Sequence, residues 1–210
     1  MNVVVRDFQA WLGTVGIDGI VIDGLLGPKT ALGALEAQKR GIVIPAAMYV
    51  DLRYHVLSQV PQRKHVSQMF GQLITKDLAS PRGGCKLLNS GWLSSIISIP
   101  VFHVKRRIHR KVAPALTLAT AEWLSTGLAW RPKSVQTYPG MPRHICWNPS
   151  RALSLHSWGI AIDFDPSLNP MGKRGQIPIL FAETMERWGF TWGGRWKGAG
   201  RDDMHFEWVR

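Results

Sequence analysis

The chain of 210 residues has little cysteine, no long apolar run and few acidic residues. Its two cysteines, Cys85 and Cys146, lack the C-x-x-C spacing of a zinc knuckle or a redox motif, so we expect two free, buried thiols. No stretch of 18 apolar residues occurs without charge, which argues against a membrane-spanning helix. The first residues, MNVVVRDFQAWLG, do not read as a signal peptide. We therefore expect synthesis in the cytoplasm, with any later release depending on another factor.

The shortage of acidic residues leaves a strong positive charge. Fourteen Asp and Glu stand against 26 Lys and Arg, for a net charge of +12 and a pI near 10.3. This excess favours an anionic partner, which is nucleic acid, a bacterial wall or an anionic membrane surface. No nucleic-acid-binding motif is present, which argues against the first. A basic surface that serves only solubility is the remaining alternative.

Turn and cap residues divide the chain into three parts. Residues 1–43 predict a small helical unit, with one helix over 2–12 and a second from Pro28 to about Arg40. A unit of this size is marginally stable alone, so we expect it to pack against the rest of the chain. Residues 44–64 predict a linker that is partly helical, and residues 65–210 a larger domain. Within that domain we expect helices after Pro114 and after Pro178, whereas residues 65–100 give no clear pattern.

Two segments of the larger domain alternate between apolar and polar residues, as half-buried strands do. In the stretch SLHSWGIAIDFD, Ile160, Ile162 and Phe164 predict a core face, opposite Gly159, Ala161, Asp163 and Asp165. In DMHFEWV, Met204, Phe206 and Trp208 predict a core face, opposite Asp203, His205 and Glu207. The polar faces of both strands therefore carry groups that can bind a metal.

His156, just ahead of the first strand, completes a set of three potential ligands with Asp163 and His205. Two imidazoles and one carboxylate are typical of a catalytic zinc whose fourth position holds water. Zinc suits this set better than other divalent ions, and it lowers the pKa of bound water to about 7. The small residues Gly159 and Ala161 are expected to keep the approach open for a substrate.

Both segments resemble one family of zinc peptidases, which includes D-alanyl-D-alanine carboxypeptidases and phage L-alanyl-D-glutamate endopeptidases. The first matches the pattern S-x-H-x-x-G-x-A-x-D at Ser154, His156, Gly159, Ala161 and Asp163. The second, DDMHFE, is similar to the D-x-x-H-F-E pattern, and WGFTWGGRW between them is similar to the phage branch. The resemblance covers about residues 65–210. It implies an α+β fold, with a small antiparallel sheet and helices in a DD-peptidase/hedgehog-like zinc fold.

The resemblance also implies roles for particular residues. His156, Asp163 and His205 would hold one zinc ion. Asp202 would be the general base, taking a proton from the attacking water and passing it to the leaving amine. An arginine ahead of the first motif usually binds a substrate carboxylate, and Arg143 is the choice here, with Arg151 as the rival. Ser154 would orient the site through hydrogen bonds.

Strand alternation and the resemblance disagree about the base. Alternation alone puts Asp203 and Glu207 on the face of His205, and Asp202 on the opposite face. The resemblance favours Asp202, which requires it to lie in the loop before the strand begins. Glu207 would then support His205 rather than act on the substrate. Many relatives carry Glu as the base, and Asp has a shorter reach.

The first 43 residues resemble the small three-helix peptidoglycan-binding domain. FQAWLG and DGLLGPKT are similar to its patterns L-Q-x-x-L-G and D-G-x-F-G-x-x-T, with Phe8 and Leu26 where Leu and Phe are usual. Together the resemblances predict a monomeric phage-type endolysin, which acts on the wall after a membrane-permeabilising protein releases it. The alternatives are a D-Ala-D-Ala carboxypeptidase and a non-catalytic protein that binds the wall.

Overall fold

The structure is a computed structural model that describes residues 2–79 and 84–210. Three helices form its N-terminal part. They are α1 (Val3–Thr14), α2 (Pro28–Lys39) and α3 (Ala46–Leu57). The side chain of Asn2 caps α1 by accepting a hydrogen bond from the backbone of Val5, and Pro28 begins α2, where its missing N–H costs nothing. The predicted helices of the first 43 residues are present, and the segment expected as a partly helical linker contains α3.

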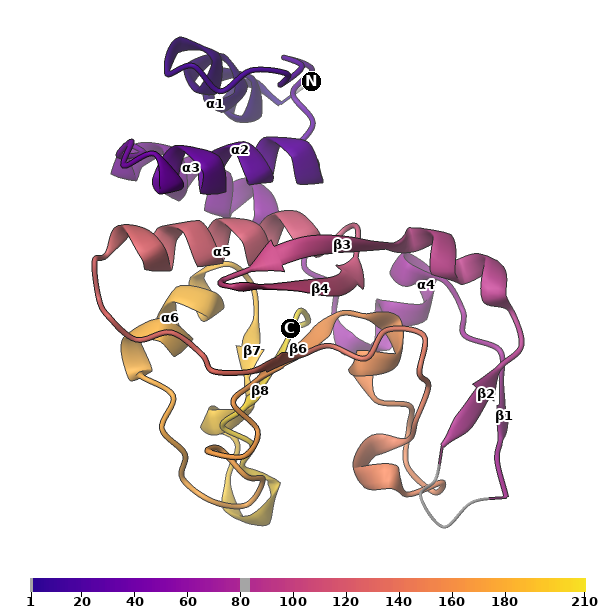
Figure 1. Cartoon of the computed structure of the whole chain (residues 1–210). Helices are drawn as coiled ribbons and strands as arrows, with labels where there is room; N and C mark the ends of the chain where they lie inside the picture. The colour runs from indigo at the N-terminus through magenta and orange to yellow at the C-terminus, as the bar shows by residue number, and fades with distance from the viewer. Residues whose placement is uncertain (1, 80–83) are drawn as a thin grey trace.

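Helix α5 (Ala113–Ser125) lies at the centre of the molecule (Figure 1). It is buried along nearly its whole length, because α2 packs along it from above while α6 (Ile179–Arg187) and the strand β3 (Ile96–Val101) cover other sides (Figure 1). Its sequence, APALTLATAEWLS, has apolar or small residues around the whole circumference, which is typical of a helix buried on all sides. The N-terminal helices therefore share one hydrophobic core with the rest of the chain.

A four-stranded antiparallel sheet lies below α5 and carries the candidate site (Figure 1). Its order is β5-β6-β8-β7, with bounds Val135–Gln136, Ala161–Phe164, His205–Glu207 and Thr191–Trp192. One face packs its aromatic rings against α6, with Phe164, Phe181 and Phe206 in mutual edge contact. The α+β class predicted from the sequence is confirmed.

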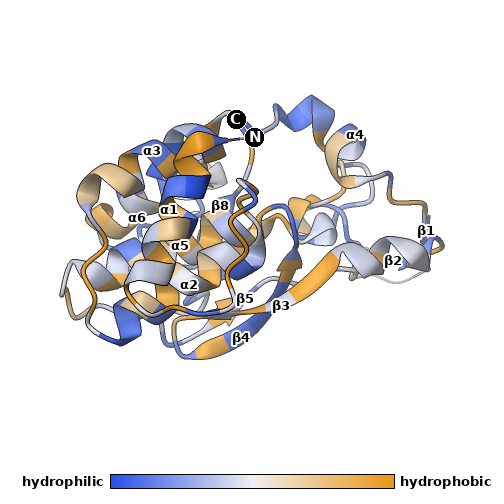
Figure 2. Ribbon diagram, turned by 90° about the horizontal axis from the view of Figure 1, so that it is seen from above, coloured by the Kyte–Doolittle hydropathy of each residue, from blue (hydrophilic) through white to orange (hydrophobic). Residues whose placement is uncertain are grey.

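Two hairpins complete the sheet structure. Strands β1 (Thr75–Asp77) and β2 (Cys85–Leu87) form one, and β3 (Ile96–Val101) and β4 (Val104–His109) form the other. Figure 2 shows the hydrophobic colour of β3 beside the hydrophilic stretch of β4, which contains the first five residues of the basic run KRRIHRK. The other helical elements are α4 (Val66–Phe70) and the 3-10 turns Arg63–His65, Ser90–Ser95, Ile145–Trp147, Leu155–Trp158, Gly193–Arg195 and Gly198–Gly200. Among the described residues, no helix has the length and apolar character needed to cross a membrane.

A buried carboxylate joins the N-terminal helices to the C-terminal part. Glu122, on α5, accepts hydrogen bonds from Arg53 of α3 (3.2 Å), Arg187 of α6 (3.1 Å) and the Trp188 indole (2.7 Å). Hydrogen bonds to a charged acceptor are the stronger kind, and removing one member of a buried network leaves the others without partners.

We expect Glu122→Ala to lower the free energy of unfolding by about 3 kcal/mol. Glu36→Ala is the matched control, because Glu36 pairs with Arg40 one helical turn away on the exposed side of α2. That pair should contribute no more than about 0.5 kcal/mol. Denaturant unfolding of both variants measures the difference, and equal losses would contradict a central role for Glu122.

Candidate metal centre

Three buried side chains bring one ligand atom each to a common point. The Asp163 Oδ1 lies 3.0 Å from His156 Nε2 and 2.9 Å from His205 Nδ1, and the two nitrogens are 3.1 Å apart. The sheet register makes this arrangement, because Asp163 of β6 and His205 of β8 are directly paired residues. Their apolar neighbours point into the aromatic core, so these two polar side chains share the opposite face.

His156 reaches the same point from a short 3-10 turn, Leu155–Trp158, just before β6. The hydroxyl of Ser154 caps this turn by accepting a hydrogen bond from the His156 backbone (3.4 Å). Gly159 ends it in the left-handed conformation, with φ of 65°. Ser154 is therefore placed to orient the imidazole through the backbone, which is the role that the resemblance implies for it.

Hydrogen bonds on the far side of each imidazole define which nitrogen faces the common point. His156 Nδ1 lies 3.0 Å from the Thr137 carbonyl oxygen, and His205 Nε2 lies 3.2 Å from Glu207 Oε2. Both partners can only accept, so each of these ring nitrogens donates its hydrogen. In the neutral rings, the two nitrogens beside Asp163 then carry lone pairs. Three electron-pair donors meeting without a hydrogen between them are what a bound cation requires.

Zinc fits this donor set. Zinc–nitrogen and zinc–oxygen bonds of about 2.0–2.2 Å place the ligands of a tetrahedral site about 3.3–3.6 Å apart, slightly more than the separations here.

Burial raises the pKa of Asp163, but the two histidines outweigh this effect and hold that pKa below its usual range. Burial also lowers the pKa of His156, whereas hydrogen bonds to Asp163 and Glu207 overcome burial and raise that of His205. Because a ligand nitrogen must carry a lone pair, binding of a metal would release any proton held on His205 Nδ1.

A cavity of about 520 Å³ opens onto the three ligand atoms. Asp202 lines it from the loop just before β8, which is the position that the resemblance requires. Its Oδ1 is buried and has no hydrogen-bond partner among the described residues. Burial raises the pKa of this carboxyl to about 6. A carboxylate held without a partner beside a candidate metal site is suited to accept a proton from water.

Residues 148–208 match the family model described as D-alanyl-D-alanine carboxypeptidase. This segment contains the three converging side chains and Asp202. The match supports a metallopeptidase that acts on the bacterial cell wall, and it covers less than a third of the chain. No curated protein and no solved structure matches the chain.

Arg143 lies on the wall of the same cavity. Its guanidinium stacks near the rings of Tyr138 and Trp147, at 5.1 and 5.3 Å from their centroids, and burial lowers its pKa. The rival, Arg151, does not line the cavity; its guanidinium lies 3.4 Å from the Cys146 thiol. Of the two arginines, Arg143 is therefore the one placed to meet a ligand.

The two other acids near His205 have structural partners. Asp203 is buried, pairs with Arg201 through two hydrogen bonds and accepts a third from the Gly175 backbone. Strand alternation is wrong for this residue, because the polypeptide turns at Asp203 and β8 begins only at His205. Glu207 lies on the strand, beside His205 on one side and in an ion pair with Arg63 on the other.

Three other sequence expectations need correction. Gly159 and Ala161 do not line the cavity; a side chain at Gly159 would collide with Pro139, 2.8 Å away, so this glycine serves a left-handed turn and close packing. Asp165 lies beyond the end of β6, where it accepts a hydrogen bond from the Ser134 backbone. Cys85 is free and buried as expected, but Cys146 is exposed, in the 3-10 turn Ile145–Trp147 on the wall of the cavity.

Some residues of the site were not predicted. Arg63 comes from the segment interpreted as a linker and contacts Glu207 across 144 positions of sequence. Thr137 contributes only a backbone carbonyl, which leaves no sequence signal. Trp196 lines the cavity and lies with its ring centroid 5.7 Å from that of His205. A large aromatic residue within the glycine-rich run GGRWKGAG was the available signal for it.

Proposed function

We propose that the chain is a phage-type endolysin, a zinc peptidase that hydrolyses an amide bond in the peptidoglycan stem peptide. The observation that carries the proposal is the convergence of His156, Asp163 and His205 beside the unpartnered carboxylate of Asp202. A metal site without such a carboxylate would suit a structural role. The two together supply what metal-assisted amide hydrolysis requires.

Each residue then has a defined task. Zinc held by the three ligands would acidify a water molecule and polarise the scissile carbonyl. Asp202 accepts a proton from the attacking water and delivers it to the leaving amine. Glu207 keeps the hydrogen on His205 Nε2, so that Nδ1 stays available as a ligand. The Thr137 carbonyl does the same for His156.

Arg143 is proposed to bind a carboxylate of the stem peptide. Its guanidinium is partly buried on the cavity wall, between two aromatic rings that hold its plane in place. No carboxylate pairs with it among the described residues, whereas Arg53, Arg63 and Arg187 all have acidic partners. A guanidinium with free donors in a cavity suits two-point recognition of a carboxylate.

The bond that is cut defines which kind of peptidase this is. The similarity of WGFTWGGRW to the phage branch favours the bond between L-Ala and D-Glu, whereas the description of the matched family model favours removal of the terminal D-Ala. Mass spectrometry of purified peptidoglycan after digestion distinguishes them. Loss of whole stem peptides beyond L-Ala supports the endopeptidase, and loss of one D-Ala supports the carboxypeptidase. Bound metal without any new amine would leave only a wall-binding protein.

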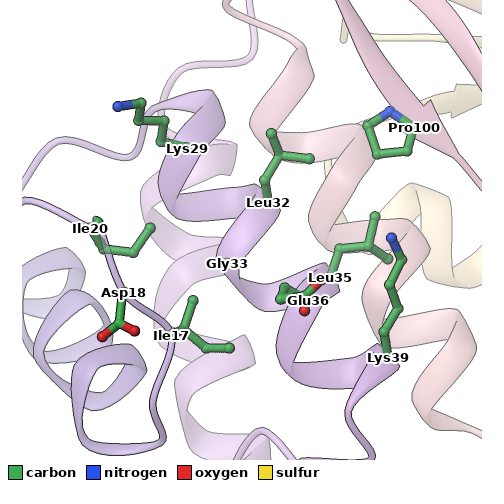
Figure 3. A pocket seen from close by; sticks show the side chains of 11 residues that line it. Ile17, Asp18, Ile20, Lys29, Leu32, Gly33, Leu35, Glu36, Lys39 and Pro100 are labelled. Carbon is green, nitrogen blue, oxygen red and sulfur yellow. The ribbon is translucent and has the colours of Figure 1, made fainter.

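The N-terminal helices are proposed to anchor the enzyme to peptidoglycan. A cavity of about 450 Å³ lies between α2, the preceding loop and Pro100 of β3 (Figure 3). Its floor is apolar, with Ile17, Ile20 and Leu35, while Lys29 and Lys39 stand toward opposite ends. An apolar floor with a few polar groups at the edge is typical of ligand sites. Tethering there would raise the local concentration of substrate without changing the chemistry.

Charge reversal tests the anchor. We expect Lys29→Glu with Lys39→Glu to weaken binding to purified sacculi by at least tenfold, while cleavage of a small soluble muropeptide stays unchanged. Lys105→Glu with Arg107→Glu, on the exposed side of β4, is the control with the same change of net charge. Co-sedimentation in low and in physiological salt measures both pairs, because salt screens exposed charges over about 8 Å at 0.15 M. Equal losses of binding in the two double variants would mean that net charge, and not this cavity, accounts for binding to the wall.

The remaining expectations follow from this function. A net charge of +12 favours adhesion to the anionic envelope, and the absence of a nucleic-acid-binding motif argues against nucleic acid as the partner. We propose that the enzyme works as a monomer and reaches the wall after release from the host cytoplasm.

A further inference from the structure

A second group of metal-binding side chains lies outside the catalytic cavity. Asp77, Cys85 and His144 each offer one atom, and these atoms lie within 4.8 Å of one another. The Asp77 Oδ1 is at the centre of the group, 3.0 Å from His144 Nε2 and 3.3 Å from the Cys85 sulfur. None of the three residues lines the cavity that contains His156.

Three separate segments build this group. Asp77 of β1 and Cys85 of β2 are directly opposite each other in the hairpin, so their side chains share one face. His144 comes from a distant loop that is bonded to the hairpin, because the Cys85 backbone donates to the Pro142 carbonyl (3.0 Å) and Gly84 bridges to Arg143. Figures 1 and 2 both show the hairpin at the edge of the molecule.

The imidazole of His144 is oriented as a metal ligand would be. Its Nδ1 lies 2.5 Å from the Arg151 carbonyl oxygen, which can only accept, so Nδ1 donates its hydrogen there. In the neutral ring, Nε2 then directs a lone pair at Asp77. The backbone carbonyl thus does for His144 what the Thr137 carbonyl does for His156.

We propose that Asp77, Cys85 and His144 form a second zinc site. One thiolate, one imidazole and one carboxylate are ligands that zinc accepts, and the soft sulfur disfavours magnesium or calcium. Bonds of about 2.0–2.3 Å to a tetrahedral zinc place such ligands about 3.3–3.6 Å apart, close to the 3.0 and 3.3 Å that separate Asp77 Oδ1 from His144 Nε2 and the Cys85 sulfur. The side chain of Asp77 is 56% exposed, which leaves an open side for entry of the ion and for a water as the fourth ligand.

Metal binding at this site replaces one hydrogen, that of the Cys85 thiol. Without a cation, the Cys85 thiol donates its hydrogen to Asp77. Binding of zinc displaces this proton to solvent, and the thiolate, imidazole and carboxylate then bind the ion directly. No oxidation or reduction takes place.

The second zinc would fasten the β1–β2 hairpin to the loop that carries Arg143, the residue next to His144. A consequence for catalysis, which rests on the proposed function, is that loss of this ion would raise the KM more than it lowers kcat. The ion itself does not depend on that function and can be detected without any substrate.

Cobalt replacement tests the second site on the whole chain. The catalytic ligands contain no sulfur, so a thiolate-to-cobalt charge-transfer band can arise only from a cysteine. We expect two equivalents of zinc or cobalt per chain and this band in the cobalt protein. Cys85→Ser should remove the band and one equivalent, and His144→Ala should lower the affinity for that equivalent by at least tenfold. Cys146→Ser is the matched control and should retain both ions and the band.

Two outcomes would overturn the second site. They are a cobalt protein without the band, and a band that disappears in Cys146→Ser. Asp77 and His144 would then form only an ion pair, with the thiol as a hydrogen-bond donor. Circular dichroism of each variant checks that the fold is kept. A single equivalent in an unaltered protein that shows the band would instead contradict the site at His156, and with it the proposed function.

Discussion

His156→Ala is expected to lose one equivalent of zinc and essentially all peptidase activity. The imidazole supplies one of three ligand atoms, and the two that remain, from Asp163 and His205, are too few for a tight site. A strong chelator should likewise abolish activity in the unaltered enzyme, and added zinc should restore it. Metal analysis and release of new amines from peptidoglycan, measured on the same sample, check both parts.

His103→Ala is the control for this variant, because His103 is exposed in the turn between β3 and β4. It should keep its zinc and its activity. A His156→Ala enzyme that retains full activity would contradict the metal site, whatever its zinc content. A variant that keeps the zinc but loses activity would assign His156 to the chemistry and not to the metal.

Alternation along two short segments was enough to predict which side chains of the sheet meet. Asp163 and His205 stand on the polar faces of adjacent strands, and their apolar neighbours had to point into the core. The same rule fails at Asp203, which precedes its strand, and at Asp165, which lies beyond the end of its own, because the side-chain period of two holds only within a strand.

Contacts between distant segments account for most of what could not be predicted. Arg63 and Thr137 reach the site through tertiary contacts. The hairpin β3–β4 is local, but residues 65–100 gave no strand signal strong enough to predict its first strand. Gly159 illustrates a different failure. Its small size suggested an open substrate path, whereas the turn and the nearby Pro139 are what require a glycine there.

Asp202→Asn is expected to lower turnover by about two to four orders of magnitude while zinc content and folding stay near normal. The substitution keeps the shape of the side chain but removes the basic oxygen. Asp202 lies outside the ligand triangle, and its Oδ1 has no partner among the described residues, so neither the metal nor a hydrogen-bond network depends on it. Its backbone, which bonds to Gly193, is unaffected by the change.

Variants of two neighbouring acids, Glu207 and Asp203, test whether Asp202 is the base. Glu207→Gln should weaken zinc binding by about 10–100-fold along with the rate, because Glu207 acts through His205. Asp203→Asn should instead lower the free energy of unfolding by about 1–3 kcal/mol, because it weakens the buried pair with Arg201. Bound zinc, turnover and denaturant unfolding, measured for all three variants, separate these effects. If Asp202→Asn stays active while Glu207→Gln holds zinc and is inactive, then Glu207 is the base, and strand alternation was the better guide to it.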